Sequence, residues 1–272
     1  NRPPDLSLIY HLVLIPVISE SKKIIEPGIN KALKGSFPAE KIIIAIALEK
    51  RASDEVKKVC EEMLLKFKNH FFDFLVIEHP DNIEGEIRAK GANVTYCAKE
   101  MKKYFEAKNI DCENIIVSCF DSDTIVSKDY FSALTYHYMV NPYRNLCSYQ
   151  PIPVYHNNIW DAASFARILD IGASFFQLIE ATNPEKMITF SSHSMSFKAL
   201  IDVGYWPVDM VSEDSAIFWK SFIFYDGRYK TIPIYVTLSM DIVNESNLWK
   251  TLKNVYGQKR RWAWGVENFP IV

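Results

Sequence analysis

Four short runs of aliphatic and β-branched residues, each separated from the next by a helical pattern, constrain the fold most strongly. They cover residues 12–15, 41–48, 72–77 and 115–117, and their length and composition predict buried strands. The clearest helical stripe between them runs from Val56 to Phe67, with Ser53 as its expected N-cap. Strands that alternate with helices pair in parallel, so the first half of the chain is predicted to be a doubly wound α/β sheet.

Prolines and charged residues guide the prediction of the remaining elements. Pro16 is expected to end the first strand, and Pro27 to lie in the first turn of a helix near residues 25–33. Pro233 predicts that the strand at residues 229–236 lies at an edge of the sheet. Residues 159–180 predict an apolar helix whose Arg167 and Asp170 argue against a bilayer span. A buried helix is the favoured interpretation, and a helix on a membrane or along an acceptor groove is the alternative.

Composition excludes several classes of protein. The chain has 272 residues, of which 49% are hydrophobic, enough for one large domain or two small ones. Its net charge of −2 means that no sequence-wide basic surface argues for nucleic-acid binding. Five cysteines without a Cys-x-x-Cys pair are typical of buried thiols in a reducing compartment. There is no apolar run of 18 residues and no linker long enough to divide domains.

Two carboxylates follow the strand at residues 115–117. Asp121 and Asp123 lie where an open α/β sheet binds ligands, at the carboxyl end of a strand. Two such residues can share a divalent cation with substrate phosphates. A polar turn after a strand explains the same residues equally well. The pair therefore indicates a metal site only if other segments supply further groups that bind a metal-bound diphosphate.

Several polar clusters follow one another along the chain: Pro16 to Glu20, Glu49, Lys90-Gly91 with Asn93, Asp121-Ser122-Asp123, Gln150-Pro151, Glu213-Asp214 and Gln258-x-x-Arg261-Trp262. Their order resembles that in the family 2 glycosyltransferases, in particular the membrane-bound branch typified by cellulose, chitin and hyaluronan synthases. The resemblance covers about residues 11–265, and its most specific part is Gln258-x-x-Arg261-Trp262. The resemblance implies the GT-A (Rossmann-like) fold, an α/β single domain with a mixed, mostly parallel sheet flanked by helices.

The resemblance also implies roles on the donor side. The expected activity is inverting, metal-dependent transfer of a sugar from a nucleotide-sugar donor, with a UDP-sugar favoured. Asp123 would be the direct ligand of Mg²⁺ or Mn²⁺, and Asp121 would bridge that metal and the ribose. The other donor-binding residues implied are Pro16, Glu20, Glu49, Lys90, Asn93 and Arg261. A solvated lysine at a helix start is an equally good interpretation of Lys90.

On the acceptor side, the resemblance implies that Asp214 is the general base that takes a proton from an acceptor hydroxyl. Capping of a helix by an acidic residue is the alternative for this position. The implied acceptor-binding residues are Gln150, Glu213, Gln258 and Trp262, to which we add His193. The family's glycines before the acceptor helix are replaced here by Ser191-Ser192-His193-Ser194, which leaves acceptor identity and processivity open. His193 is equally well interpreted as a structural histidine.

Domain organisation and surroundings follow from the same resemblance. Residues 1–272 are expected to form one GT-A catalytic domain, with a nucleotide-sugar-binding half (1–127) and an acceptor-binding half (128–272). The expected partners are a nucleotide-sugar donor, a carbohydrate or lipid-linked acceptor and the cytoplasmic face of a membrane, reached through flanking helices. Two alternatives remain: a catalytically silent nucleotide-sugar-binding module, and a sugar-nucleotide pyrophosphorylase. The pyrophosphorylase is disfavoured because residues 16–20 contain no glycine for a phosphate loop.

Overall fold

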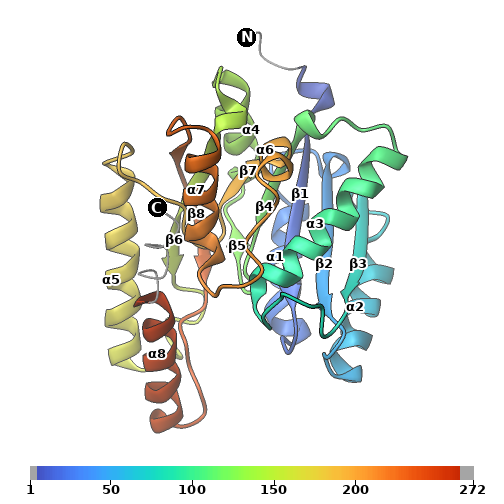
Figure 1. Cartoon of the computed structure of the whole chain (residues 1–272). Helices are drawn as coiled ribbons and strands as arrows, with labels where there is room; N and C mark the ends of the chain where they lie inside the picture. Colours follow the sequence, from blue (N-terminus) through green and yellow to red (C-terminus); the bar gives the residue numbers. More distant parts are fainter. Residues whose placement is uncertain (1–4, 264–272) are drawn as a thin grey trace.

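A computed structural model describes residues 5–263 of the chain (Figure 1). The strands are β1 (Tyr10–Val17), β2 (Ile42–Glu49), β3 (Asp73–His79), β4 (Ile115–Cys119), β5 (Ile125–Val126), β6 (Cys147–Tyr155), β7 (Ser194–Ser196) and β8 (Lys230–Met240). The α-helices are α1 (Lys22–Leu33), α2 (Asp54–Phe67), α3 (Lys90–Ala107), α4 (Tyr130–Val140), α5 (Ser164–Ala181), α6 (Phe197–Asp202), α7 (Glu213–Phe224) and α8 (Leu248–Ala263). Short 3₁₀ helices cover Leu6–Leu8, Ala39–Lys41, Cys112–Asn114 and Arg144–Leu146.

All of these strands belong to one mixed sheet with the order β3-β2-β1-β4-β7-β6-β8-β5. The four strands predicted from the apolar runs form its parallel half, β3-β2-β1-β4. β7 pairs antiparallel with both β4 and β6, and β8 returns parallel to β6. The prediction of a doubly wound first half is therefore confirmed, because helices α1, α2 and α3 separate these four parallel strands along the chain.

Alternate residues of the central strands pack into two hydrophobic cores on opposite faces of the sheet. In β2, Ile42, Ile44 and Ile46 point into the core that is covered by α1, α2 and α4. Ile43, Ala45 and Ala47 point into the core under α3, α6 and α7. A strand buried on both faces has no polar alternation, which is why the sequence shows β2 as a continuous apolar run.

Three details predicted from proline differ in the structure. β1 continues through Pro16, which lies opposite Ala47 of β2, and ends at Val17. Pro27 lies inside α1, beyond the first turn, because that helix already begins at Lys22. β8 is not an edge strand, since β5 lies outside it. β5 covers only Leu238 and Ser239, so the proline at position 233 does not interrupt the pairing with β5.

The helix predicted at residues 159–180 is not a buried helix. In α5 the side chains of Ile168, Phe175 and Ile179 are exposed, together with those of Leu169, Ile171, Phe176 and Leu178. α8 lies beside α5 at one side of the molecule (Figure 1) and exposes Leu248, Trp249, Leu252 and Tyr256. Within residues 5–263, no helix is both long and apolar enough to cross a membrane.

His11 gives the fold a predictable dependence on pH. Its ring lies between Phe37 and Phe131, and burial lowers its pKa to about 3. Unfolding returns this pKa to about 6.5, so below that pH the unfolded chain binds a proton that the folded chain does not. Stability that depends on a neutral His11 is therefore complete above pH 6.5 and is lost as the pH falls towards 3.

We expect the free energy of unfolding to fall by about 2 kcal/mol from this residue alone between pH 6.5 and 5. His11→Gln should reduce the pH-dependent loss by that amount, whatever it does to stability at neutral pH. Urea unfolding at both pH values measures the difference, and the variant His70→Gln, at an exposed position, is the matched control. An unchanged loss in His11→Gln would show that His11 is not the group responsible.

Candidate active site

A large cleft of about 1580 Å³ opens at the carboxyl ends of β1, β2 and β4. Most of the residues singled out from the sequence line it: Pro16, Glu20, Glu49, Lys90, Asn93, Asp121, Asp123, Glu213, Asp214, Gln258, Arg261 and Trp262. Parallel strands end at the same sheet edge, which explains why clusters far apart in the sequence meet there. Two of the predicted site residues, Gln150 and His193, are fully buried and do not line the cleft.

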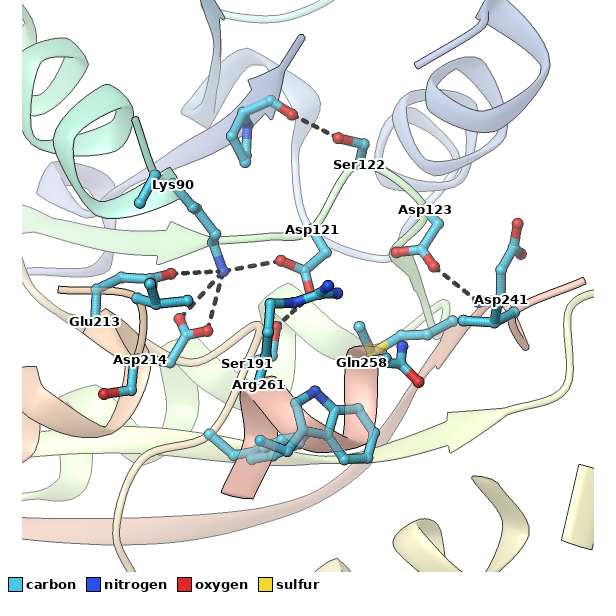
Figure 2. Close-up of a pocket in the computed structure, with 18 of the residues that line it drawn as sticks. Lys90, Asp121, Ser122, Asp123, Ser191, Glu213, Asp214, Asp241, Gln258 and Arg261 are labelled. Carbon is cyan, nitrogen blue, oxygen red and sulfur yellow. Dashed lines mark hydrogen bonds and ion pairs between the residues drawn. The ribbon is translucent and has the colours of Figure 1, made fainter. Parts of the chain in front are cut away.

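The ammonium group of Lys90 joins two sides of this cleft (Figure 2). Its Nζ lies 2.8 Å from Asp121 Oδ1. It also lies 3.1 Å from both carboxylate oxygens of Asp214 and 3.3 Å from Glu213 Oε1. Lys90 begins α3, Asp121 follows β4, and Glu213 and Asp214 begin α7. One charged group therefore holds the candidate metal ligand and the candidate base together.

The electrostatics of this cluster favour charge on Lys90. Burial alone would lower the pKa of Lys90, but the carboxylates of Asp121 and Asp214 raise it well above its usual value. Burial would likewise raise the pKa of Asp121, yet the charge of Lys90 and the Ser191 hydroxyl lower it. Glu213 differs, because burial and the neighbouring Asp214 raise its pKa to about 8. The pKa of Asp121 is thus lowered by Lys90, whereas the pKa of Glu213 is raised despite the same ammonium group.

Asp123 points away from Lys90, towards Asp241 after β8 (Figure 2). It accepts a hydrogen bond of 2.9 Å from the backbone N–H of Asp241. Burial, followed by the charge of Asp121, raises the pKa of Asp123 to about 7. In the described part of the chain, no positive side chain neutralises Asp123 in the way that Lys90 neutralises Asp121. This arrangement fits a divalent cation that both carboxylates bind and whose remaining coordination positions a diphosphate fills. Within residues 5–263 no group of three or more His, Cys, Asp or Glu side chains forms a metal cage by itself.

The loop that carries both aspartates is anchored on two sides. Ser122 Oγ donates a hydrogen bond of 2.5 Å to the carbonyl of Pro16, at the end of β1. On the other side, the backbone N–H of Asp121 donates to Ser192 Oγ at 3.2 Å, and Ser191 Oγ donates to the Asp121 carboxylate. The loop is thereby attached to the segments on both sides of β4, which fixes where its carboxylates point.

Hydrogen bonds and ion pairs also order the part of the cleft that lies next to β1 and β2. Glu20 Oε2 accepts hydrogen bonds from the N–H groups of Ile18 and Ser19, at 2.7 and 2.9 Å. The buried Glu49 carboxylate contacts Arg51 Nε at 3.3 Å and His79 Nδ1 at 3.5 Å. The side-chain amide of the buried Asn93 donates to the carbonyl of Ala47 at 2.7 Å, which ties α3 to β2.

Gln150 and His193 lie beneath the cleft, where they contact the segment 189–193. Gln150 Oε1 accepts a hydrogen bond of 2.8 Å from the N–H of Phe190. His193 Nδ1 lies 3.0 Å from the carbonyl oxygen of Phe190 and 3.8 Å from Asp214 Oδ1. Both residues therefore support the segment 189–193, part of which lines the cleft.

α8 closes the other side of the cleft with Gln258, Arg261 and Trp262. Figure 2 shows Arg261 reaching from this helix to the side of Asp121. The ring of Trp262 packs against Phe190 at 5.8 Å between centroids, and Lys259 Nζ lies 3.6 Å from its centroid. Lys259 also pairs with the buried Asp170 of α5. This ion pair holds α8 against α5.

Comparison with known families assigns the chain. The model of the family described as "Glycosyl transferase family group 2" matches residues 116–271, more than half of the sequence. The chain belongs to this family. The resemblance inferred from the polar clusters is thereby confirmed, and the chain is a member of a family of sugar-transferring enzymes.

Named relatives cover nearly all of this family 2 chain. Poly-beta-1,6-N-acetyl-D-glucosamine synthase of Staphylococcus epidermidis is 25% identical over 258 residues, which is 93% of this chain and 53% of that protein. The protein of the same name from Staphylococcus aureus strain COL is 23% identical over 277 residues, 97% of this chain and 57% of that protein. The chain spans about half the length of the curated relatives it matches.

Solved structures establish the fold. The mannosyltransferase PcManGT from Pyrobaculum calidifontis, in complex with GDP-Man and Mn²⁺, aligns over 96% of this chain and 65% of its own, with a TM-score of 0.57 and 14% identity. S. aureus TarS 1–349 in complex with UDP-GlcNAc aligns over 91% of this chain and 65% of its own, with a TM-score of 0.56 and 14% identity. The predicted GT-A fold class is confirmed.

Several cleft residues escaped the sequence analysis. Asp241 directly follows β8, which runs parallel to β6. Its position at the carboxyl end of a strand is the feature from which the sequence could have identified it. Ser191 was noted only as part of the run Ser191-Ser192-His193-Ser194, because its contact with Asp121 joins residues 70 positions apart. Arg51 and Phe176 also line the cleft, and both look like ordinary helix or loop residues in the sequence.

Gly91 gives a test of how α3 and α7 approach each other. A Cβ at this position would lie 2.3 Å from the carbonyl oxygen of Pro207 and 3.0 Å from Cβ of Glu213. Gly91→Ala should therefore push Lys90 away from Asp214 and cost about 1–3 kcal/mol of stability. Thermal unfolding measures the loss. Gly172→Ala in α5 is the matched control, since nothing lies within 4 Å of a Cβ there.

Alanine is the better helix former by up to about 1 kcal/mol, so Gly172→Ala should leave stability unchanged or raise it. Equal melting temperatures for Gly91→Ala and the parent would contradict the tight approach of the two helices.

Proposed function

We propose that this chain is the catalytic region of an inverting, metal-dependent glycosyltransferase that moves a sugar from a nucleotide-sugar donor to a hydroxyl acceptor. Residues 1–127 would bind the donor and residues 128–272 the acceptor, within one GT-A domain. The observation that carries the proposal is the contact of Lys90 with both Asp121 and Asp214. It brings a candidate diphosphate-and-metal site and a candidate proton acceptor into one cleft, which is what sugar transfer from a nucleotide requires.

Asp214 is the proposed general base. It lies at the cleft wall, with its side chain 22% exposed, and both carboxylate oxygens already accept hydrogen bonds from Lys90. A carboxylate in this place can take the proton of an acceptor hydroxyl while that oxygen attacks the anomeric carbon. The sugar–phosphate bond breaks on the opposite side and the bonding electrons leave with the diphosphate, which inverts the anomeric centre.

Three cationic contributions would stabilise the departing diphosphate. Asp121 and Asp123 would hold Mg²⁺ or Mn²⁺, which supplies positive charge to the leaving group. Arg261 offers a planar fork of donors that matches phosphate oxygens. Lys90 remains in contact with Asp121 and adds its charge at the same place. The Mn²⁺ of the mannosyltransferase complex supports a metal in a protein of this fold.

The donor base would lie among Pro16, Glu20 and Glu49, with Asn93 supporting that wall. A UDP-sugar is the proposed donor. The similarity to TarS with UDP-GlcNAc supports this choice, although the mannosyltransferase of the same fold is a complex with GDP-Man.

The acceptor would bind between α5, α7 and α8. Trp262 offers a flat apolar face to a sugar ring, and Gln258 on α8 and Glu213 on α7 supply polar groups to the same cleft. The proposed acceptor is a growing polysaccharide or a glycolipid. The names of the relatives, which are synthases of a glucosamine polymer, support a carbohydrate acceptor.

Donor turnover in water tests the proposal without knowledge of the acceptor. The parent should release UDP from a UDP-sugar in the presence of Mn²⁺. Asp123→Asn should abolish release, because it removes a metal ligand. Asp214→Asn should lower kcat by about 100-fold or more, the range of a general base. Asp202→Asn is the matched control, since Asp202 pairs with Lys198 on α6.

Parental rates in Asp123→Asn would refute the metal role. Binding of UDP with Mn²⁺ by the parent, without any release from a screen of UDP-sugars and acceptors, would instead favour a catalytically silent binding module.

We further propose that the full protein works at the cytoplasmic face of a membrane. α5 and α8 expose many apolar side chains, among them those of Ile168, Leu169, Phe175, Ile179, Leu248, Trp249 and Leu252. α8 adds the exposed cationic residues Lys250 and Lys253, which suit anionic headgroups.

Flotation with lipid vesicles tests this surface. The parent should float with vesicles that contain about 30% anionic lipid, since apolar burial and headgroup attraction act together. The double variant Phe175→Ser, Ile179→Ser should reduce the bound fraction several-fold. Leu65→Ser, at an exposed apolar position of α2, is the control. A parent that stays with the unbound protein would contradict the membrane proposal.

A further inference from the structure

The segment 189–193, Thr-Phe-Ser-Ser-His, leads into β7 and lies against both halves of the candidate site. β7 pairs antiparallel with β4, and the pairing continues beyond it as a 3.1 Å hydrogen bond from the N–H of Cys119 to the carbonyl of His193. The segment therefore enters the sheet at the point where the loop of Asp121 leaves it. This placement gives its side chains access to the loop after β4 and to the start of α7.

The two serines of the segment contact the Asp121 loop. Ser191 Oγ donates to the Asp121 carboxylate. Ser192 Oγ accepts a hydrogen bond of 3.2 Å from the N–H of Asp121 and lies 2.9 Å from Thr124 Oγ1. Backbone and side chain of Asp121 are thus both held by neighbouring hydroxyls.

The residues on either side of the serines contact Asp214. Thr189 Oγ1 donates to the carbonyl of Asp214 at 2.5 Å. His193 Nδ1 lies 3.8 Å from Asp214 Oδ1. Gln150 holds the segment from below through the N–H of Phe190. One short segment therefore links the candidate metal ligand to the candidate base through contacts on both sides.

Ser192 adopts a conformation that serine rarely adopts. Its φ is +60°, in the left-handed region, and its side chain is fully buried. Glycine would reach this conformation without steric cost, whereas a residue with a Cβ meets a cost of the order of 1 kcal/mol. Such a conformation persists only where surrounding contacts hold it, and strained residues of this kind concentrate at functional sites. The contacts that hold Ser192 are those of its hydroxyl with Asp121 and Thr124.

We propose that Ser191 and Ser192 are positioning residues whose hydroxyls set the location and orientation of Asp121 relative to Asp214. This inference rests on the proposed function, because it concerns the spacing between the metal-and-diphosphate site and the base. The serines need not touch substrate. They act through Asp121, so their removal should leave the fold nearly intact while it displaces the carboxylate on which turnover depends.

Ser192→Gly is the informative variant, since it removes the hydroxyl and also relieves the backbone. We expect its melting temperature to equal or exceed that of the parent. Its kcat for Mn²⁺-dependent release of UDP should fall about tenfold or more, a larger factor than the change in KM for the UDP-sugar. The electron paramagnetic resonance spectrum of Mn²⁺ bound with UDP should differ from that of the parent. Ser191→Ala should reproduce the kinetic change, and Ser191→Thr should restore turnover by returning the hydroxyl.

Asn109→Gly is the matched control. Asn109 also has a left-handed backbone, with φ of +55°, but it lies after α3 and outside the cleft. It should keep the kcat and the Mn²⁺ spectrum of the parent.

A Ser192→Gly protein with parental kcat and an unchanged Mn²⁺ spectrum would overturn the inference. If Ser192→Gly does not fold, parental turnover in Ser191→Ala would overturn it instead. A parent that neither binds Mn²⁺ with UDP nor releases UDP would contradict the proposed function, which separates the two failures.

Discussion

The ion pairs of Lys90 are the interaction on which the site depends. One ammonium lies within 3.3 Å of carboxylate oxygens of Asp121, Glu213 and Asp214, and its side chain is 20% exposed. Burying a charged group lowers stability unless an opposite charge pairs with it. Removal of one partner from a buried ion pair commonly lowers the free energy of unfolding by about 3–5 kcal/mol. Because the partners belong to the loop after β4 and to α7, the pairing also fixes α3 against both. The small size of Gly91 makes that approach possible.

The cleft combines one wall from the parallel half of the sheet with another from a helix late in the chain. The first wall lies where β1, β2 and β4 are buried and end together. The second wall depends on α8, the last helix described, which is held by Lys259 against the buried Asp170 of α5. Trp262 takes its place in the cleft through this helix and through its packing on Phe190. The cleft is therefore complete only when elements from both halves of the sequence have come together.

Local patterns in the sequence were sufficient for the parallel half of the fold. β-Branched runs such as residues 42–48 and the stripe from Val56 to Phe67 depend on short-range periodicity, so they predict elements reliably. Asp121 and Asp123 could be found because strand ends are recognisable. The prediction for α5 was wrong because an apolar helix has the same composition whether protein covers it or not. The edge prediction for β8 failed because nothing local shows that β5 pairs with two residues near its end.

Contacts between distant segments explain what the sequence could not provide. Gln150 and His193 were expected at the acceptor, whereas the structure places both beneath the cleft, in contact with the segment 189–193. The hydroxyls of Ser191 and Ser192 reach Asp121 only because β7 pairs with β4.

A crystal structure with Mn²⁺ and UDP tests the central claim most directly, through the anomalous scattering of the metal. We expect a single strong peak within coordination distance of Asp123, a diphosphate between that peak and Arg261, and Asp214 across the cleft from it. Nucleotide bound elsewhere, or a metal peak remote from both Asp121 and Asp123, would contradict the convergence of these residues on a metal-bound diphosphate.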